Sequence, residues 1–276
     1  RLADMRERMR QGSGAPAGAW FGARWAVPWP QPPRGWLAGA GPLAWRQATG
    51  SLRGAPGWML ATIVMLAAVL GFGLWTRLGR PLPPDVLSLV AVQVVVMLTI
   101  FQTVLLRFDF RADLDRMESL KALPLSPLSI AAGQIATPVV LMTISQWLII
   151  AAGAALFPRH AWFFMAAACV APGVNIMLVG VENAMFLLYP TRPPAGPVIE
   201  IQRIGRGTFI SLAKFALVLG AAGAVGGVGG AVYWLSGGSW GAAAVAGWLA
   251  LALISAIVVA TVAKAFRKFD VSRDVG

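Results

Sequence analysis

Cysteine and histidine are almost absent from this chain of 276 residues, which contains one of each, Cys169 and His160. A disulfide needs two cysteines, and zinc and haem sites draw on several thiol or imidazole ligands, so a disulfide framework and these metal or cofactor sites are not expected. No G-x-x-x-x-G-K-[ST] motif occurs, and the chain therefore lacks the phosphate-binding loop of a nucleotide-driven motor. His160 lies beside Arg159 in a short turn with no acidic residue at hand to orient it, so we expect no catalytic residue and no enzymatic activity.

Charged residues are also scarce, at 12%, whereas 58% of the residues are hydrophobic. Soluble domains contain about 25% charged and about 45–50% apolar residues, so this composition predicts a protein that resides in a bilayer. The net charge of +12 would suit nucleic acid if the basic residues formed one patch on a polar surface. The basic residues instead flank apolar runs, and we expect the lipid bilayer, not nucleic acid, to be the partner of this chain.

The first 56 residues form a polar tail rich in arginine, proline and tryptophan. Prolines forbid a long regular helix here, and the tryptophans either stack on a partner or, as we favour, mark the interfacial belt of a membrane. A short helix is predicted at Gly41–Arg53, with Leu43, Trp45 and Leu52 turned towards lipid. The chain begins with Arg1 and shows no signal peptide, so we expect it to be the C-terminal part of a longer protein.

Six apolar segments follow within residues 57–276, each bounded by charged residues, proline or glycine. About 20 helical residues cross roughly 30 Å of hydrocarbon, so these segments predict an all-α polytopic membrane protein. The six spans are predicted at Gly57–Thr76, Val86–Leu106, about Gln134–Phe157, Ala161–Tyr189, Phe209–Leu235 and Ser239–Ala263. The uncharged run from Ala122 to Pro158 is too long for one crossing, so its first part, Ala122–Gly133, is expected at the membrane interface.

The distribution of basic residues predicts the orientation of these spans. The tail carries eight, the loop after the second span four, the loop after the fourth span three and the C-terminus four. The opposite side carries only Arg77, Arg80 and Arg159, while Lys214 lies inside the fifth span. By the positive-inside rule this imbalance of 19 to 3 places the tail, both larger loops and the C-terminus in the cytoplasm. Nineteen of the 23 basic residues are arginine, which together with the abundant alanine, glycine and proline fits a GC-rich bacterial genome. We therefore expect a multi-pass protein of a bacterial inner membrane, with both ends of this chain cytoplasmic.

The loop between the second and third spans, Arg107–Gln134, carries the strongest functional signal. Leu114, Met117 and Leu120 recur there at every third position, which predicts a short amphipathic helix between Arg111 and Leu123. The other faces of this helix carry charged residues, namely Asp113, Asp115, Arg116, Glu118 and Lys121. Taken alone, this pattern fits an ordinary solvated helix and a docking element equally well.

A proline and a serine define the shape of this loop. Pro124 ends the amphipathic helix, because the residue before a proline avoids the helical conformation. Ser126 then suits the N-cap of a new helix, and Pro127 suits its first position, where the missing N–H costs nothing. The sequence thus predicts a helix, a sharp turn and a membrane helix, and we call the segment Arg111–Ser126 the elbow.

This loop resembles the coupling helix of type-2 ABC transporter permeases. The chain from Gly41 onward resembles a bacterial family of ABC exporters. The resemblance rests on four segments, FDFRADLDRMESLKALPLSP, GPLAWRQ, VENAMFLLYPTRP and the terminal FDVSRD. The resemblance implies a permease subunit, or half, that works by alternating access and is powered by a separate ABC ATPase subunit, with two permease units forming a dimer. The coupling residues that it implies are Asp113, Asp115, Arg116, Met117, Glu118, Leu120, Leu123, Pro124 and Ser126.

Two functions of other classes remain open. One is a secondary transporter or channel without an ATPase, in which an acidic residue inside a span would be central. The other is a non-transporting membrane scaffold, in which the tail of residues 1–56 would bind the partner.

Three polar residues stand out in the fourth predicted span, namely Asn175, Glu182 and Asn183. An ionisable group inside a membrane is costly and often functional. Glu182, however, lies about 20 residues into the span, or roughly 30 Å, which corresponds to the cytoplasmic edge. We therefore favour an interfacial salt bridge to Arg192, Arg203 or Arg206, while a helix break at Pro172 would leave Glu182 deeper.

Glycines in the fifth predicted span recur four residues apart, Gly223 with Gly227 and Gly226 with Gly230. Small residues at this spacing form one face of a helix, on which a second helix can approach closely. This glycine face could pack against another helix of the same chain or form a seam between two copies, and the sequence favours neither.

Overall fold

The computed structural model describes residues 36–53, 56–78, 93, 110, 113–190 and 201–270. All elements in these ranges are helices, which confirms the predicted all-α class for this part of the chain. Four of the described helices are long and apolar enough to cross a membrane, so the protein is membrane-embedded. They are α6 (Pro127–Leu156), α7 (Ala161–Leu188), α8 (Ile201–Leu235, apolar from Thr208) and α9 (Trp240–Lys268).

The remaining described elements are shorter or less apolar. They are η1 (Trp36–Gly39), α2 (Ala40–Arg53), α3 (Pro56–Leu78), η2 (Leu114–Arg116), α5 (Met117–Lys121) and η3 (Pro158–His160). Helix α3 covers the predicted first span, with its described apolar part at Thr62–Thr76. The predicted second span at 86–106, most of the tail and the loop at 191–200 lie outside the described residues.

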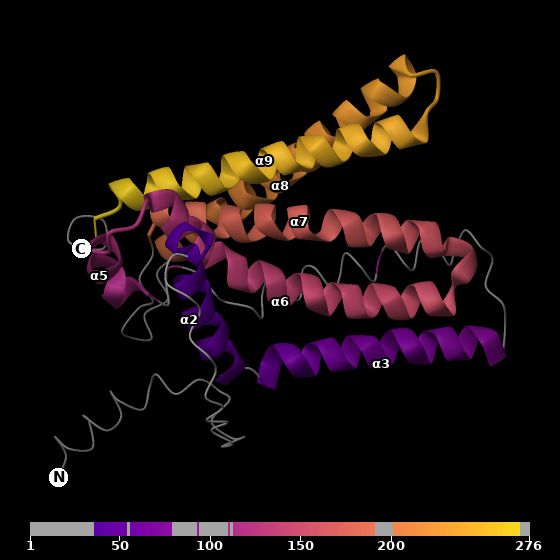
Figure 1. Cartoon of the computed structure of the whole chain (residues 1–276), viewed down its shortest axis with the longest axis horizontal. Helices are drawn as coiled ribbons and strands as arrows, with labels where there is room; N and C mark the ends of the chain where they lie inside the picture. Colours follow the sequence, from indigo (N-terminus) through magenta and orange to yellow (C-terminus); the bar gives the residue numbers. More distant parts are fainter. Residues whose placement is uncertain are drawn as a thin grey trace, which may run out of the picture.

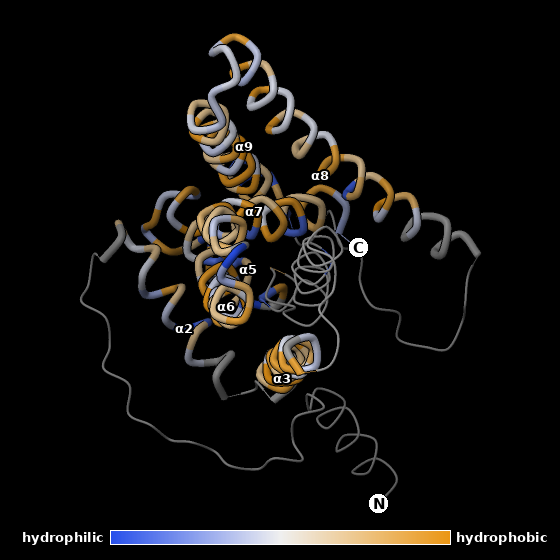
Figure 2. The backbone as a smooth tube through the Cα atoms, turned by 90° about the vertical axis from the view of Figure 1, so that its right-hand side faces the viewer, coloured by the Kyte–Doolittle hydropathy of each residue, from blue (hydrophilic) through white to orange (hydrophobic). Residues whose placement is uncertain are grey.

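Three of the long helices, α6, α7 and α9, pack against one another. Helix α3 packs on α6 and helix α8 packs mainly on α9, so α3 and α8 lie on opposite sides of this group (Figure 2). Figure 1 shows α2, α5 and the end of α9 at one end of the bundle, while the α6–α7 and α8–α9 turns lie at the other. This is the grouping of loops and ends that the basic residues predict for the helices described.

Large apolar side chains cover the outer surface of α8. Phe209, Leu212 and Phe215 are between 62% and 68% exposed, and Figure 2 shows apolar residues at intervals along the coloured part of this helix. Such a surface is unfavourable in water, whereas in hydrocarbon it is as apolar as its surroundings. The exposed residues therefore agree with a location in lipid.

Helix α2 does not lie on lipid through Leu43, and that prediction is wrong. Leu43 is only 7% exposed and belongs to the hydrophobic core, because α2 packs across the start of α6. The crossing occurs at Gly133, where a Cβ atom would lie 2.7 Å from the carbonyl oxygen of Ala40. The hydroxyl of Thr137 donates to the carbonyl of Ala44 at 2.6 Å and fixes the same contact.

Trp45 and Leu52 were predicted on the same lipid-facing side of α2 as Leu43. Trp45 is half-buried, while the side chain of Leu52 lies outside the described residues.

Helix α6 begins earlier than the predicted span, at Pro127 instead of about Gln134. Its 30 residues extend over about 45 Å, which exceeds the roughly 30 Å of hydrocarbon. The predicted interfacial segment is thus partly the first two turns of one continuous helix. These turns carry Gly133 and Gln134, which contact α2 and the elbow.

Candidate functional site

The elbow folds largely as its prolines and serines predict. A 3-10 turn, η2, leads into the five residues of α5, and the helix ends at Lys121 because Pro124 keeps Leu123 out of the helical conformation. This helix is shorter than the predicted 111–123. Ser126 caps α6 as predicted, since its hydroxyl oxygen accepts a hydrogen bond from the backbone N–H of Ser129 at 3.0 Å.

The apolar face of the elbow points into the protein. Met117 is fully buried and Leu120 is 3% exposed. Both belong to a core cluster with Phe110, Phe266 and Phe269, the last two at the end of α9. The rings of Phe110 and Phe266 stack with centroids 5.3 Å apart. The predicted amphipathic face is therefore confirmed, and it is covered by the chain's own helices.

A buried carboxylate joins the elbow to α2 and α6. Asp113 forms an ion pair with Arg46 of α2 and accepts a hydrogen bond from the amide of Gln134 at 2.9 Å. Asp113 and Gln134 are both buried, whereas the Arg46 side chain is partly exposed. A buried carboxylate is stable only when it is paired and hydrogen-bonded, so these three residues fix the position of the turn before α5.

Two further polar contacts join the elbow region to α7 and α9. The Lys121 ammonium donates to the backbone carbonyl of Phe269, just beyond α9. The side-chain oxygen of Asn183 in α7 accepts from the backbone N–H of Phe110 at 3.1 Å, and its amide donates to the Val179 carbonyl at 2.8 Å. The elbow and Phe110 just before it are therefore held by side chains or backbone of α2, α6, α7 and α9.

The coupling residues suggested by the sequence thus divide into two groups. Asp113, Met117 and Leu120 face the interior, where they hold the elbow in place. The exposed group is Arg116, Glu118, Leu123, Pro124 and Ser126. The side chain of Asp115 lies outside the described residues. A partner protein can therefore reach the second group directly, whereas the first group acts only through the position of the elbow.

Glu182 forms an ion pair with Lys214 of α8, with 2.5 Å between its carboxylate oxygen and the ammonium nitrogen. Both side chains are partly buried. Glu182 thus does form a salt bridge, but with the lysine inside the fifth predicted span; the side chains of the three arginines predicted as partners, Arg192, Arg203 and Arg206, lie outside the described residues. Helix α7 also continues through Pro172 without a break. Glu182 and Asn183 are neighbours in sequence but contact different elements.

Asn175 belongs to a separate polar cluster in the interior of the bundle. Its amide donates to Thr143 at 3.0 Å and to Gln146 at 2.8 Å, and its oxygen accepts from Gln146 at 3.2 Å. All three side chains are buried between α6 and α7. Neither Thr143 nor Gln146 was predicted from the sequence, although a glutamine within an apolar run is itself a signal of such a contact.

A tryptophan replaces the donor that Pro172 removes, and a second tryptophan binds the next carbonyl; neither contact was predicted from the sequence. Proline lacks an N–H, so Ala168, four residues earlier, loses its helical hydrogen-bond donor. The indole N–H of Trp147 in α6 donates to this carbonyl at 2.9 Å, and that of Trp248 in α9 donates to the next one, Cys169, at 3.3 Å. Both tryptophans hold α7 at its proline.

The glycines singled out in α8 make no close contact within the described part of the chain. A Cβ atom at Gly223, Gly226, Gly227 or Gly230 would meet no atom within 4 Å. Close helix approaches occur elsewhere, at Gly133, Gly153, Gly173 and Gly180, where the nearest atoms lie under 3.0 Å from a Cβ. Among the described residues no packing on the α8 glycine face is seen, and a seam between two copies stays a prediction.

Comparisons with known proteins identify no relative of this chain: no family model, no curated protein and no solved structure matches it. Across the described ranges, no group of three or more His, Cys, Asp or Glu residues is placed to hold a metal ion. The elbow, with its buried anchors and its exposed charged side, is therefore the candidate site that the geometry supports best.

Proposed function

We propose that this chain is the permease subunit of an ATP-driven ABC exporter, with a separate ATPase subunit docked on the elbow. The observation that carries this proposal is the attachment of the elbow, whose exposed side bears Arg116 and Glu118 while its other side is joined to α2, α6 and the end of α9, and through the preceding Phe110 to α7. Because protein interiors are densely packed, a displacement of the elbow moves the ends of α2, α6, α7 and α9 with it. The resemblance of the loop to a coupling helix supports the same function.

In this proposal the unit has six spans, lies in a bacterial inner membrane with both ends of the chain cytoplasmic, and pairs with a second permease unit. Closure of the ATPase pair on ATP pushes the elbow, and the attached helices rearrange around a path by alternating access. The four described long helices and the location of α2, α5 and the end of α9 at one end of the bundle support this arrangement.

Charge reversal on the exposed side tests the docking. The Glu118→Arg variant should lower ATPase stimulation by the permease about tenfold, which corresponds to a loss of about 1.4 kcal/mol of binding. The full chain is purified from its native membranes with the P-loop ATPase that accompanies it, and hydrolysis is measured in liposomes. Arg159→Glu is the matched control, because Arg159 is exposed in η3 at the opposite end of the bundle. Unchanged stimulation by Glu118→Arg, or no ATPase with the purified chain, contradicts the proposal.

The partly buried Glu182–Lys214 pair favours one alternative, a secondary transporter in which this carboxylate carries coupling ions. Under the ABC proposal the pair is structural. Glu182→Gln then leaves a lysine without its carboxylate and lowers thermal stability, and the double variant Glu182→Gln/Lys214→Gln regains it while ATPase stimulation persists. Ion-driven transport without ATP that is abolished in both variants would instead identify the secondary transporter.

A further inference from the structure

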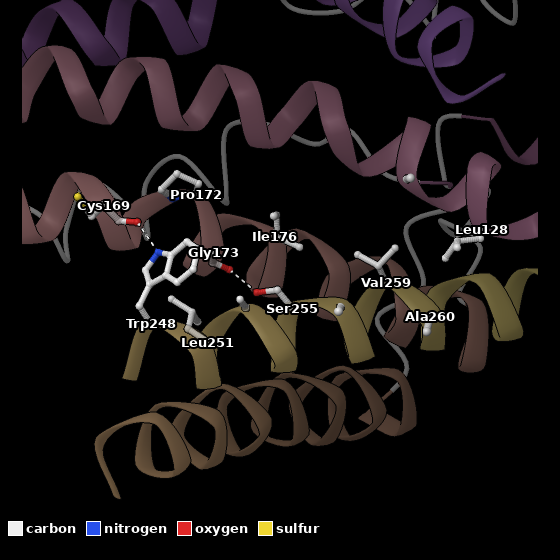
Figure 3. Close-up of a pocket in the computed structure, with 13 residues that line it drawn as sticks. Leu128, Cys169, Pro172, Gly173, Ile176, Trp248, Leu251, Ser255, Val259 and Ala260 are labelled. Atoms are coloured by element: carbon white, nitrogen blue, oxygen red, sulfur yellow. Dashed lines mark hydrogen bonds between the residues drawn. The ribbon is translucent and has the colours of Figure 1, made fainter. Parts of the chain in front are cut away.

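A groove of about 650 Å³ lies between α7 and α9 and reaches the first turn of α6 (Figure 3). Its lining is almost entirely apolar and includes Leu128, Ile176, Trp248, Leu251, Ala256 and Ala260. Figure 3 shows the side chain of Trp248 at one end of the groove and Leu128 and Ala260 at the other. The floor is formed by the α7 turn that contains Pro172 and Gly173.

The polar groups of Trp248 and Ser255 are already engaged. The indole N–H of Trp248 donates to the Cys169 carbonyl, and the hydroxyl of Ser255 donates to the Gly173 carbonyl at 3.0 Å. Both hydrogen bonds are dashed lines in Figure 3. A polar or charged solute would find few partners here and would lose its hydration. A hydrocarbon chain has no polar groups to dehydrate, and it gains van der Waals contacts with the lining.

The groove has the length of one membrane leaflet. Its lining on α9 extends from Trp248 to Ala260, a rise of about 18 Å along the helix axis. Half of the roughly 30 Å hydrocarbon layer is about 15 Å. The groove therefore accommodates the acyl chain of a lipid from a single leaflet.

A cationic residue of α9 lies one helical turn beyond the end of the groove. Lys264 follows Ala260, at the edge of the lining, by one helical turn and is exposed. Arg267 and Lys268 follow within the last turn of the helix. In Figure 1 this end of α9 lies beside the elbow. The apolar groove thus ends where a lipid headgroup would meet positive charge.

We propose that this groove binds an anionic phospholipid of the bilayer, with one acyl chain along α9 and the headgroup phosphate at Lys264. Charge complementarity at the exposed Lys264 and the leaflet-length apolar lining favour this occupant over a helix of a second copy, which would use the lining but not the ammonium. The site does not depend on the proposed transport function.

Two variants separate the two parts of the site. The full chain in detergent is titrated with phosphatidylglycerol and with phosphatidylcholine of the same acyl chains, and bound lipids are counted by native mass spectrometry. The wild-type chain should retain phosphatidylglycerol at least fivefold better. Lys264→Gln should abolish this preference, and Ala256→Phe should reduce retention of both lipids by filling the groove. The matched controls are Arg159→Gln at the opposite end and Ala224→Phe on the exposed surface of α8.

A second measurement tests the groove without the Ala256→Phe variant, which could misfold. Phospholipids with brominated acyl chains quench nearby indoles, so they should quench Trp248, and the Lys264→Gln variant should need more of the anionic lipid for the same effect. The Trp248→Phe variant identifies the part of the signal that belongs to this groove. Equal retention of both lipids by the wild-type chain overturns the proposal, and so does a groove variant that dissociates a dimer without changing lipid retention.

Discussion

The Leu120→Asp variant is expected to detach the elbow from the bundle. Leu120 is 3% exposed and packs with Met117, Phe110 and the phenylalanines at the end of α9. The substitution removes about 1.5–3 kcal/mol of apolar burial and places a carboxylate among apolar side chains without a designed partner. The total loss should exceed about 4 kcal/mol, enough to release the elbow even if the membrane helices persist.

Limited proteolysis measures this release. Trypsin should cut after Arg116 and Lys121 at least tenfold faster in Leu120→Asp than in the wild-type chain, because cleavage follows the population of the open state. Leu123→Asp is the matched control, since Leu123 is 39% exposed and its substitution should leave the cleavage rate unchanged. Equal cleavage of Leu120→Asp and the wild-type chain would contradict the buried position of Leu120.

The same variant separates the fold of the elbow from its proposed docking. Leu120→Asp and Glu118→Arg should both lower ATPase stimulation, but only Leu120→Asp should increase proteolysis. If Glu118→Arg also increased cleavage, its effect on hydrolysis would reflect unfolding of the elbow and would not support a docking surface.

The Gly133→Leu variant is expected to separate α2 from α6. A Cβ atom at Gly133 would lie 2.7 Å from the Ala40 carbonyl oxygen and 2.9 Å from the Leu43 Cβ. The first of these atoms is backbone, so the clash is relieved only if the whole helix moves. Overpacking of this kind costs about 1–3 kcal/mol, and a displaced α2 also loses the Thr137 hydrogen bond and weakens the Arg46–Asp113 pair.

A matched glycine provides the control for this prediction. A Cβ atom at Gly223 would meet no atom within 4 Å in the described chain, so Gly223→Leu should be nearly neutral. Thermal unfolding in detergent compares the two variants, and crosslinking of cysteines placed on α2 and α6 reports whether the helices remain together. Equal stability of the two variants would contradict the close crossing at Gly133. A large loss for Gly223→Leu that depends on chain concentration would indicate a seam between two copies.

The membrane helices and the local shape of the elbow could be predicted from the sequence, because both depend on neighbouring residues. Apolar runs of about 20 residues define α6 to α9, and Ser126 with Pro127 defines the start of α6. The burial of Leu43 could not be predicted in the same way. An apolar face on a short helix has the same pattern whether lipid or another helix covers it.

The hydrogen-bond and ion-pair partners of the polar residues also could not be predicted from the sequence. Glu182 pairs with a lysine 32 residues away, and Asn175 bonds to Gln146, which lies 29 residues earlier on a neighbouring helix. The spacing of residues along one helix predicts which side chains share a face. It does not predict which residue of another helix lies opposite, because that depends on how the helices pack.

The two tryptophans at Pro172 have a mechanical consequence. Bending α7 further at this proline would separate Ala168 and Cys169 from the indoles of Trp147 and Trp248. In hydrocarbon no water replaces the indole at the Ala168 carbonyl, which has no helical N–H partner, and leaving that carbonyl unpaired costs several kcal/mol. Helix α7 is therefore not a free hinge, despite its proline. Any large movement of this protein should displace α6, α7 and α9 as a single rigid block, with the sliding surfaces located where α3 and α8 meet that block.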